Sequence, residues 1–389
     1  MSPNSEFQFN YRILSEKGRE SLRNYKYACI DDSPFGNYVT HPFWNYIVQY
    51  FPLKMAPNLI TLIGFIFTLC HYFLLCQINF CLNKNSNLPS YVLFFAGLFV
   101  FLSHTFDGVD GKQARRTKSS SALGEIFDHG IDAWTTLFIV NCFLTVFGTH
   151  LTPIEKLLGQ ITIMYGFAVC HWEKYLTGYL ILPWIFDISQ VAFSALLITL
   201  SVVGYQGIID EMLPQVFIYL VYGYFLILFP YYIVRGILAS KARKPPLLHY
   251  FTPFFDVTFL SVLTILYTNH SPEDILGRNP RWILYAHGTT TAHIMTRLIV
   301  AQLTKERLRI FTPITLTYCL WISISWSLSY HLKVTLQMEN PYQMETLMLQ
   351  FCCLIITWLH LSYVVRLINE ICQLLNIRAF SITPEEKTE

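Results

Sequence analysis

Four aspartates of the chain form two closely spaced pairs, Asp107 with Asp110 and Asp128 with Asp132. Residues three or four apart on a helix project from one face, so each pair can present its carboxylates together. Carboxylates at the end of apolar helices repel one another and lose hydration, and they therefore need a counter-charge. All-oxygen ligands select hard cations such as Mg²⁺ or Mn²⁺, and two such ions could bridge a diphosphate.

Glycine and arginine residues accompany the aspartates. Gly111 and Gly124 lack side chains where a nucleotide would approach the backbone, and Gly124 lies one turn before Asp128. Arg115 is the predicted clamp for a diphosphate or nucleotide. The alternative is that the carboxylates pair with nearby Lys and Arg residues in a solvated loop. Ionisable residues at helix ends facing a bundle interior usually serve function, which favours the metal site.

The order of these residues also matches a family signature. The pattern Asp-Gly-x₂-Ala-Arg-x₈-Gly-x₃-Asp-x₃-Asp starts at Asp110 and is preceded by Asp107. At every fixed position it resembles the signature of the CDP-alcohol phosphotransferase family. The resemblance implies two divalent metal ions, a CDP-alcohol donor and release of CMP.

The resemblance also assigns roles to individual residues. It makes Asp107, Asp110 and Asp128 metal ligands, with Asp132 either the remaining ligand or the catalytic base. The residues that it places at the nucleotide are Gly111, Ala114, Arg115, Gly124 and Glu125.

His129 is a second candidate for the base. The run Asp128-His129-Gly130-Ile131-Asp132 resembles the third motif of the eukaryotic choline and ethanolamine phosphotransferases of this family, whose histidine is a candidate proton acceptor. Imidazole suits this role because cations depress the basicity of a bound carboxylate, whereas histidine titrates near neutrality. We favour His129 over Asp132. A role for His129 in orienting Asp128 or a headgroup is the remaining alternative.

Pro57-Asn58-Leu59-Ile60-Thr61 begins the first long apolar segment. Pro at this place is an ordinary signal for a helix N-terminus. The family has a similar Pro-Asn-x-x-Thr element, which implies that Asn58 contacts the nucleotide and that Thr61 lies on the same side of the helix.

A third cluster, rich in Trp and Tyr, occupies residues 171–178 and 182–190. Such a segment is also typical of an anchor at the membrane interface, which is the alternative interpretation. We predict that four of its residues line the site for the lipid acceptor or headgroup: His171, Glu173, Asp187 and Gln190. Glu173 or Asp187 would raise the basicity of His129 if either lay close to it.

The same cluster resembles the ethanolaminephosphotransferase branch of selenoprotein I type. The dual choline/ethanolamine branch has Asp-Val-Thr-Glu where this chain has Asp187 to Gln190, so Gln190 favours the ethanolamine branch. This resemblance implies CDP-ethanolamine as donor and diacylglycerol, or an alkyl- or alkenyl-acylglycerol, as acceptor. A choline or dual-specificity enzyme is the alternative within the family. A membrane transporter for cations or metabolites is the alternative from another class, because intramembrane carboxylates also mark ion pathways.

The composition is that of a membrane protein. Of the 389 residues, 53% are hydrophobic and 13% are charged, whereas soluble domains carry about 25% charged residues. The net charge of +2 and the scattered basic residues argue against nucleic acid as a partner.

Apolar segments long enough to cross a bilayer predict an all-α integral membrane protein. We expect a bundle of about ten transmembrane helices, preceded by an interfacial or packed helix near residues 41–51. The predicted spans are 57–77, 90–110, 128–148, 156–172, 183–204, 214–234, 250–268, 281–303, 310–331 and 344–366.

Basic residues predict the orientation, because Lys and Arg of short loops remain in the cytosol. They place the N-terminus and the aspartates on the cytosolic side of an endoplasmic reticulum or Golgi membrane. We divide the chain into a cytosolic N-terminal segment, catalytic helices, additional helices for structure or homodimerisation, and a cytosolic tail: 1–56, 57–240, 241–370 and 371–389.

Overall fold

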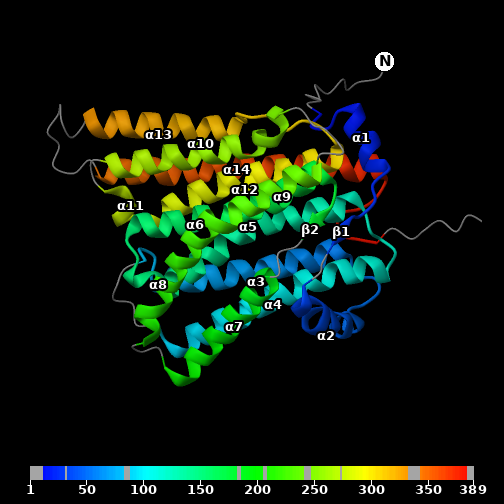
Figure 1. Ribbon diagram of the computed structural model, residues 1–389, viewed down its shortest axis with the longest axis horizontal. Helices are drawn as coiled ribbons and strands as arrows, with labels where there is room; N and C mark the ends of the chain where they lie inside the picture. The colour runs from blue at the N-terminus through cyan, green and yellow to red at the C-terminus, as the bar shows by residue number, and fades with distance from the viewer. Residues whose placement is uncertain are drawn as a thin grey trace, which may run out of the picture.

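A computed structural model describes residues 12–30, 33–82, 88–181, 185–204, 208–240, 247–271, 274–331 and 342–382. Ten long helical segments run back and forth through this part of the chain (Figure 1). They are α3 (Pro57–Ile78), α4 (Ser90–Arg116), α5 (Ala122–Phe147), α6 (Pro153–Thr177), α7 (Ile185–Val203), α8 (Ile208–Gly223) continued by α9 (Phe229–Ser240), α10 (Leu247–His270), α12 (Pro280–Thr304), α13 (Pro313–Tyr330) and α14 (Tyr342–Leu375).

Seven of these segments in the described part of the chain are long and apolar enough to cross a membrane. The three outside this group are α6, α12 and α13. Helix α12 is buried along most of its length, where it packs against α5, α6 and α14. The prediction of an all-α integral membrane protein with a bundle of about ten helices is thus confirmed.

Helix α4 extends further than its predicted span, which was expected to end at residue 110. It continues to Arg116, and only residues 117–121 separate it from α5. Its last turns are tied to the segment before α3. Gln113 donates to the carbonyls of Pro52 and Met55, and Arg116 donates to the carbonyls of Val48 and Phe51. These contacts satisfy polar side chains that hydropathy assigned to a loop.

The N-terminal segment forms a cap at the end of the bundle where α4 ends and α5 begins. It contains α1 (Glu16–Arg23), β1 (Cys29–Ile30) and α2 (His41–Ile47) (Figure 1). Strand β1 pairs in parallel with β2 (Leu180–Ile181), which follows α6. In α2, Trp44 is buried against Gly108, where an added Cβ would overlap the indole ring. The cap is therefore packed onto the helices that carry the aspartates.

Candidate active site

Three aspartates from two helices converge where α4 and α5 face each other. Asp107 and Asp110 lie on α4 and Asp128 lies on α5. One carboxylate oxygen of each lies within 4.8 Å of the others. Three hard oxygen ligands at this separation can hold one divalent cation.

Asp132 lies one turn after Asp128 and borders the same site. It lines a small cavity of about 30 Å³ together with Asp107, His104 of α4 and Gln190 of α7. The fourth predicted aspartate is therefore next to the cluster, on the side that faces α7.

The aspartate cluster has little positive charge from the protein itself. In the part of the chain that the structure describes, none of the four aspartates forms an ion pair with Lys or Arg. Thr61 of α3 faces the cluster, and its hydroxyl donates to Asp110. Adjacent carboxylates with so little counter-charge are destabilised, so this set of oxygen donors suits bound cations.

The glycines of the site leave space that the protein does not fill. A Cβ on Gly111 would meet nothing closer than the Arg115 guanidinium at 3.6 Å, and one on Gly124 nothing closer than 3.8 Å. Both are ordinary contact distances, so packing within the chain does not require either glycine. Gly108 is different, because Trp44 occupies the space beside it. Space kept open at Gly111 and Gly124 is consistent with the predicted approach of a nucleotide.

The other predicted nucleotide residues surround this open space. The Asn58 amide nitrogen donates to the carbonyl of Ala379 at 2.9 Å, and its oxygen faces Gly124. Arg115 is exposed, and its guanidinium lies over Gly111. Ala114 is half-buried on the same helix. Their contacts with a nucleotide stay predictions.

Glu125 is engaged by side chains of the protein, and its predicted contact with the nucleotide stays a prediction. It is buried, and both Lys174 of α6 and the hydroxyl of Tyr25 donate hydrogen bonds to it. Burial and the charge of Glu125 raise the pKa of the Tyr25 phenol well above its ordinary value, so this hydroxyl keeps its proton and acts as donor. Glu125 therefore forms a buried charge pair beside the predicted nucleotide site.

His129 lies between this charge pair and the aspartates. Its Nε2 is 3.8 Å from Asp128 Oδ2, and its Nδ1 is 3.9 Å from Glu125 Oε1. The His171 ring stacks edge-on against it with centroids 5.2 Å apart, and Gln302 of α12 donates to the His171 carbonyl. Two carboxylates thus approach His129 from opposite nitrogens of its ring.

The two acids predicted to support His129 have other partners. Glu173 is paired with Arg235 of α9, whose Nε donates to Glu173 Oε1 at 2.8 Å. Asp187 accepts a hydrogen bond of 3.1 Å from Thr40 and lies 3.7 Å from His104 Nε2. His171 of α6 contacts His129, and residues two apart on a helix do not face the same side, so Glu173 points away from His129. The acids near His129 are Asp128 and Glu125 instead.

Three residues near the site were not predicted from the sequence. His104 lies one turn before Asp107, and this helical spacing is a signal that could have identified it. The charge rule for short loops would place Lys174 in a cytosolic loop, yet it is buried within α6. No local pattern indicated that Tyr25 would contact Glu125, 100 residues away.

These features agree with a family match that covers the site. Residues 54–238 match the CDP-alcohol phosphatidyltransferase family, a span that includes all four aspartates, both glycines and His129. Similarity to named relatives extends the match over most of the chain. The chain therefore belongs to the CDP-alcohol phosphatidyltransferase family and is a membrane enzyme of this class.

The relatives are more specific. Ethanolaminephosphotransferase 1 of Mus musculus is 34% identical over 313 residues, which cover 76% of this chain and 79% of the relative. The Homo sapiens protein of the same name is 31% identical over 388 residues, which cover 96% and 95%. Choline/ethanolaminephosphotransferase 1 of Arabidopsis thaliana is 29% identical over 406 residues, which cover 96% and 99%.

Proposed function

We propose that this enzyme transfers phosphoethanolamine from CDP-ethanolamine to the hydroxyl of diacylglycerol, or of an ether-linked analogue, and releases CMP. The observation that carries the proposal is the convergence of Asp107, Asp110 and Asp128 without a Lys or Arg partner in the described part of the chain. The names of the mouse and human relatives support ethanolamine as the headgroup.

The four aspartates would hold two Mg²⁺ or Mn²⁺ ions, with Asp132 as the fourth ligand. Bound cations of this kind neutralise the charge of a diphosphate and the charge that develops on its leaving group. Asn58 and Arg115 would orient the nucleotide over Gly111 and Gly124. Catalysis then depends mainly on positioning and on electrostatic stabilisation.

His129 would accept the proton of the lipid hydroxyl. The hydroxyl oxygen attacks the phosphorus that bears ethanolamine, the bond from that phosphorus to the CMP oxygen breaks, and CMP leaves. Glu125 lies 3.9 Å from Nδ1, outside hydrogen-bond distance, and is itself paired with Lys174. Asp132 is the alternative base. A variant Asp132→Asn that still binds metal and donor but has no turnover, beside an active His129→Gln, would favour Asp132.

The small cavity beside Asp132 suits a primary ammonium group. It is small, about 30 Å³, and Asp107 and Asp132 line it. The buried Oε1 of Gln190 has no hydrogen-bond partner among the described residues and can accept from an ammonium N–H. A trimethylammonium group is larger and has no N–H to donate. Gln190 thus supports ethanolamine over choline.

The predicted orientation is consistent with the arrangement of the helices. The cap, the end of α4 and the start of α5 lie at one end of the bundle (Figure 1). We propose that this end faces the cytosol of an endoplasmic reticulum or Golgi membrane. Residues 57–240 would form the catalytic part, and the helices of residues 241–370 would serve structure or a homodimer.

The deciding experiment measures CMP release by the purified protein in detergent. CDP-ethanolamine or CDP-choline is supplied with diacylglycerol, with Mg²⁺, Mn²⁺ or EDTA. We expect metal-dependent release of CMP with phosphatidylethanolamine as product, and slower reaction with CDP-choline. Equal or faster turnover of CDP-choline would contradict the headgroup assignment, and turnover in EDTA would contradict the metal site.

A further inference from the structure

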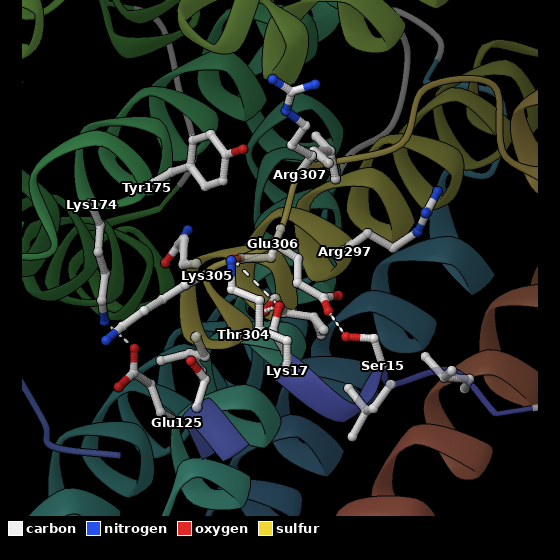
Figure 2. A pocket seen from close by; sticks show the side chains of 18 of the residues that line it. Ser15, Lys17, Glu125, Lys174, Tyr175, Arg297, Thr304, Lys305, Glu306 and Arg307 are labelled. Atoms are coloured by element: carbon white, nitrogen blue, oxygen red, sulfur yellow. Dashed lines mark hydrogen bonds and ion pairs between the residues drawn. The ribbon is translucent and has the colours of Figure 1, made fainter. Parts of the chain in front are cut away.

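A second and much larger cavity touches α5 only at Glu125, near the start of the helix. Its volume is about 1500 Å³, and it is bordered by the segment 12–28, the end of α6, and the end of α12 with the loop that follows. Figure 2 shows Lys174 and Lys305 lining this cavity from different elements. Apart from Glu125 and the end of α6, its wall lies outside the segment that matches the family. None of the four aspartates lines it, and Glu125 is the residue that borders both this cavity and the candidate active site.

The wall of this cavity is strongly basic. Two glutamates line it, Glu125 and Glu306, whereas the whole chain has a net charge of only +2. The eight basic residues of the wall are Arg12, Lys17, Lys26, Lys174, Arg297, Lys305, Arg307 and Arg309. Like charges gathered in one concave space attract and concentrate anions.

Acidic residues neutralise only part of this charge, since Glu125 pairs with Lys174 and Glu16 pairs with Arg12. Glu125 is engaged by Lys174 and Tyr25, and Glu306 accepts a hydrogen bond from Ser15, the N-cap of α1 (Figure 2). Within the described residues, Lys17, Lys305 and Arg307 have no ion-pair partner.

Close packing of α1 against the end of α12 holds the basic residues of the two segments together. Gly18 of α1 lies against the end of α12, where an added Cβ would lie 3.1 Å from Thr304 Cβ. Leu14 and Leu22 bury their side chains in one cluster with Ile299 and Val300 of α12. A surface that merely obeyed the charge rule for cytosolic loops would not need this arrangement.

We propose that this cavity binds a phosphate-bearing anion. Arg and Lys both suit phosphate oxygens, Arg by its planar fork of N–H donors and Lys as a point charge. The cavity lies at the end of the bundle that carries α1, where both water and lipid headgroups can reach it. The phosphate therefore belongs either to a soluble molecule or to the headgroup of an anionic lipid. The proposal does not depend on the reaction proposed above.

The test measures the melting temperature of the purified full chain in EDTA, so that no divalent cation brings phosphate to the aspartates. One arm titrates inorganic phosphate against chloride at fixed ionic strength. The other arm compares detergent micelles containing phosphatidate with micelles containing phosphatidylcholine. A ligand that binds only the folded state raises its stability, and we expect a rise of about 2 °C or more in one arm.

The double variant Lys305→Ala/Arg307→Ala should lose this rise. Arg23→Ala, which removes an exposed basic residue of α1 outside the cavity, should keep it. If the double variant does not fold, the single variant Arg307→Gln at an exposed position replaces it. A rise with phosphate identifies a soluble ligand, and a rise with phosphatidate alone identifies a lipid. No rise in either arm, or the same rise in the cavity variants, overturns the proposal.

Discussion

Two neighbouring stripes of α5 carry acidic residues in opposite situations. Asp128 and Asp132 face the aspartates of α4, and no Lys or Arg of the described chain pairs with them. Glu125 faces α6 and the N-terminal segment, where Lys174 and Tyr25 satisfy its carboxylate. The difference separates a carboxylate whose counter-charge is part of the fold from carboxylates whose counter-charge must come from outside.

His129 belongs to both stripes, because it lies within 4 Å of an acid on each. A base placed there can receive a proton beside the cations. The comparison therefore predicts different consequences for variants on the two stripes. Variants of the aspartates should lose activity and keep stability, and variants of the Glu125 pair should lose stability first.

The largest expected effect is that of Asp128→Ala. We expect it to remove essentially all CMP release, because a ligand of the cations is lost, while the protein stays folded and loses only repulsion among carboxylates. Mn²⁺ should raise the melting temperature of the wild type, since a ligand at 100 times its Kd adds about 2.7 kcal/mol. This rise should disappear in Asp128→Ala.

The matched control for this variant is Asp274→Ala, an exposed aspartate that caps α11 (Ile275–Arg278) at the other end of the bundle (Figure 1). It should keep both CMP release and the response to Mn²⁺. Near wild-type production of phosphatidylethanolamine by Asp128→Ala would show that the metal site is wrongly placed.

The second effect concerns the other stripe. Lys174→Met leaves Glu125 buried without its cation, and breaking a buried pair in this way costs about 3–5 kcal/mol. We expect a large fall in melting temperature, whereas Lys54→Met, at an exposed position away from the cavity, should have none. The double variant Lys174→Met/Glu125→Gln should recover part of the loss. A wild-type melting temperature for Lys174→Met would contradict the structural role of this pair.

The sequence predicted one stripe and not the other for a physical reason. Asp128 and Asp132 are linked by helical spacing, which is visible over a few residues. The contact between Tyr25 and Glu125 joins residues 100 positions apart, and no local pattern reveals it. Lys174 fitted the charge rule for cytosolic loops equally well. Its pairing became visible only once α5 and α6 were packed together.

The fold shows the same division. Hydropathy predicted the long helices because a lipid environment demands long apolar segments. The predicted end of α4, at residue 110, was too early. Gln113 and Arg116 are polar, but their side chains donate to carbonyls of the N-terminal segment, and the helix continues to Arg116. Contacts between distant segments again determined where the helix ends, which composition alone could not predict.

A smaller effect distinguishes open glycines from packed ones. Gly111→Ala should stabilise the protein by about 0.5–1 kcal/mol, because Gly within a helix is less stable than Ala. The same methyl group should raise the KM for CDP-ethanolamine, since it enters the space proposed for the nucleotide. Gly108→Ala is the control, and it should lower stability because the methyl group would overlap Trp44. An unchanged KM in Gly111→Ala would contradict the proposal that the nucleotide occupies the space beside Gly111.

The smallest effect is expected at the edge of the aspartate stripe, where Gln190 lines the small cavity with Asp132. The amide oxygen of Gln190 can accept only from an ammonium that has N–H groups, so Gln190→Leu should favour choline relative to ethanolamine. We expect the ratio of kcat/KM for CDP-choline to that for CDP-ethanolamine to rise by roughly tenfold or less, about 1 kcal/mol. Ser189→Leu, an exposed neighbour outside the cavity wall, controls for the substitution. If both variants change the ratio equally, the headgroup does not contact Gln190, and the two stripes of α5 would then differ in metal binding alone.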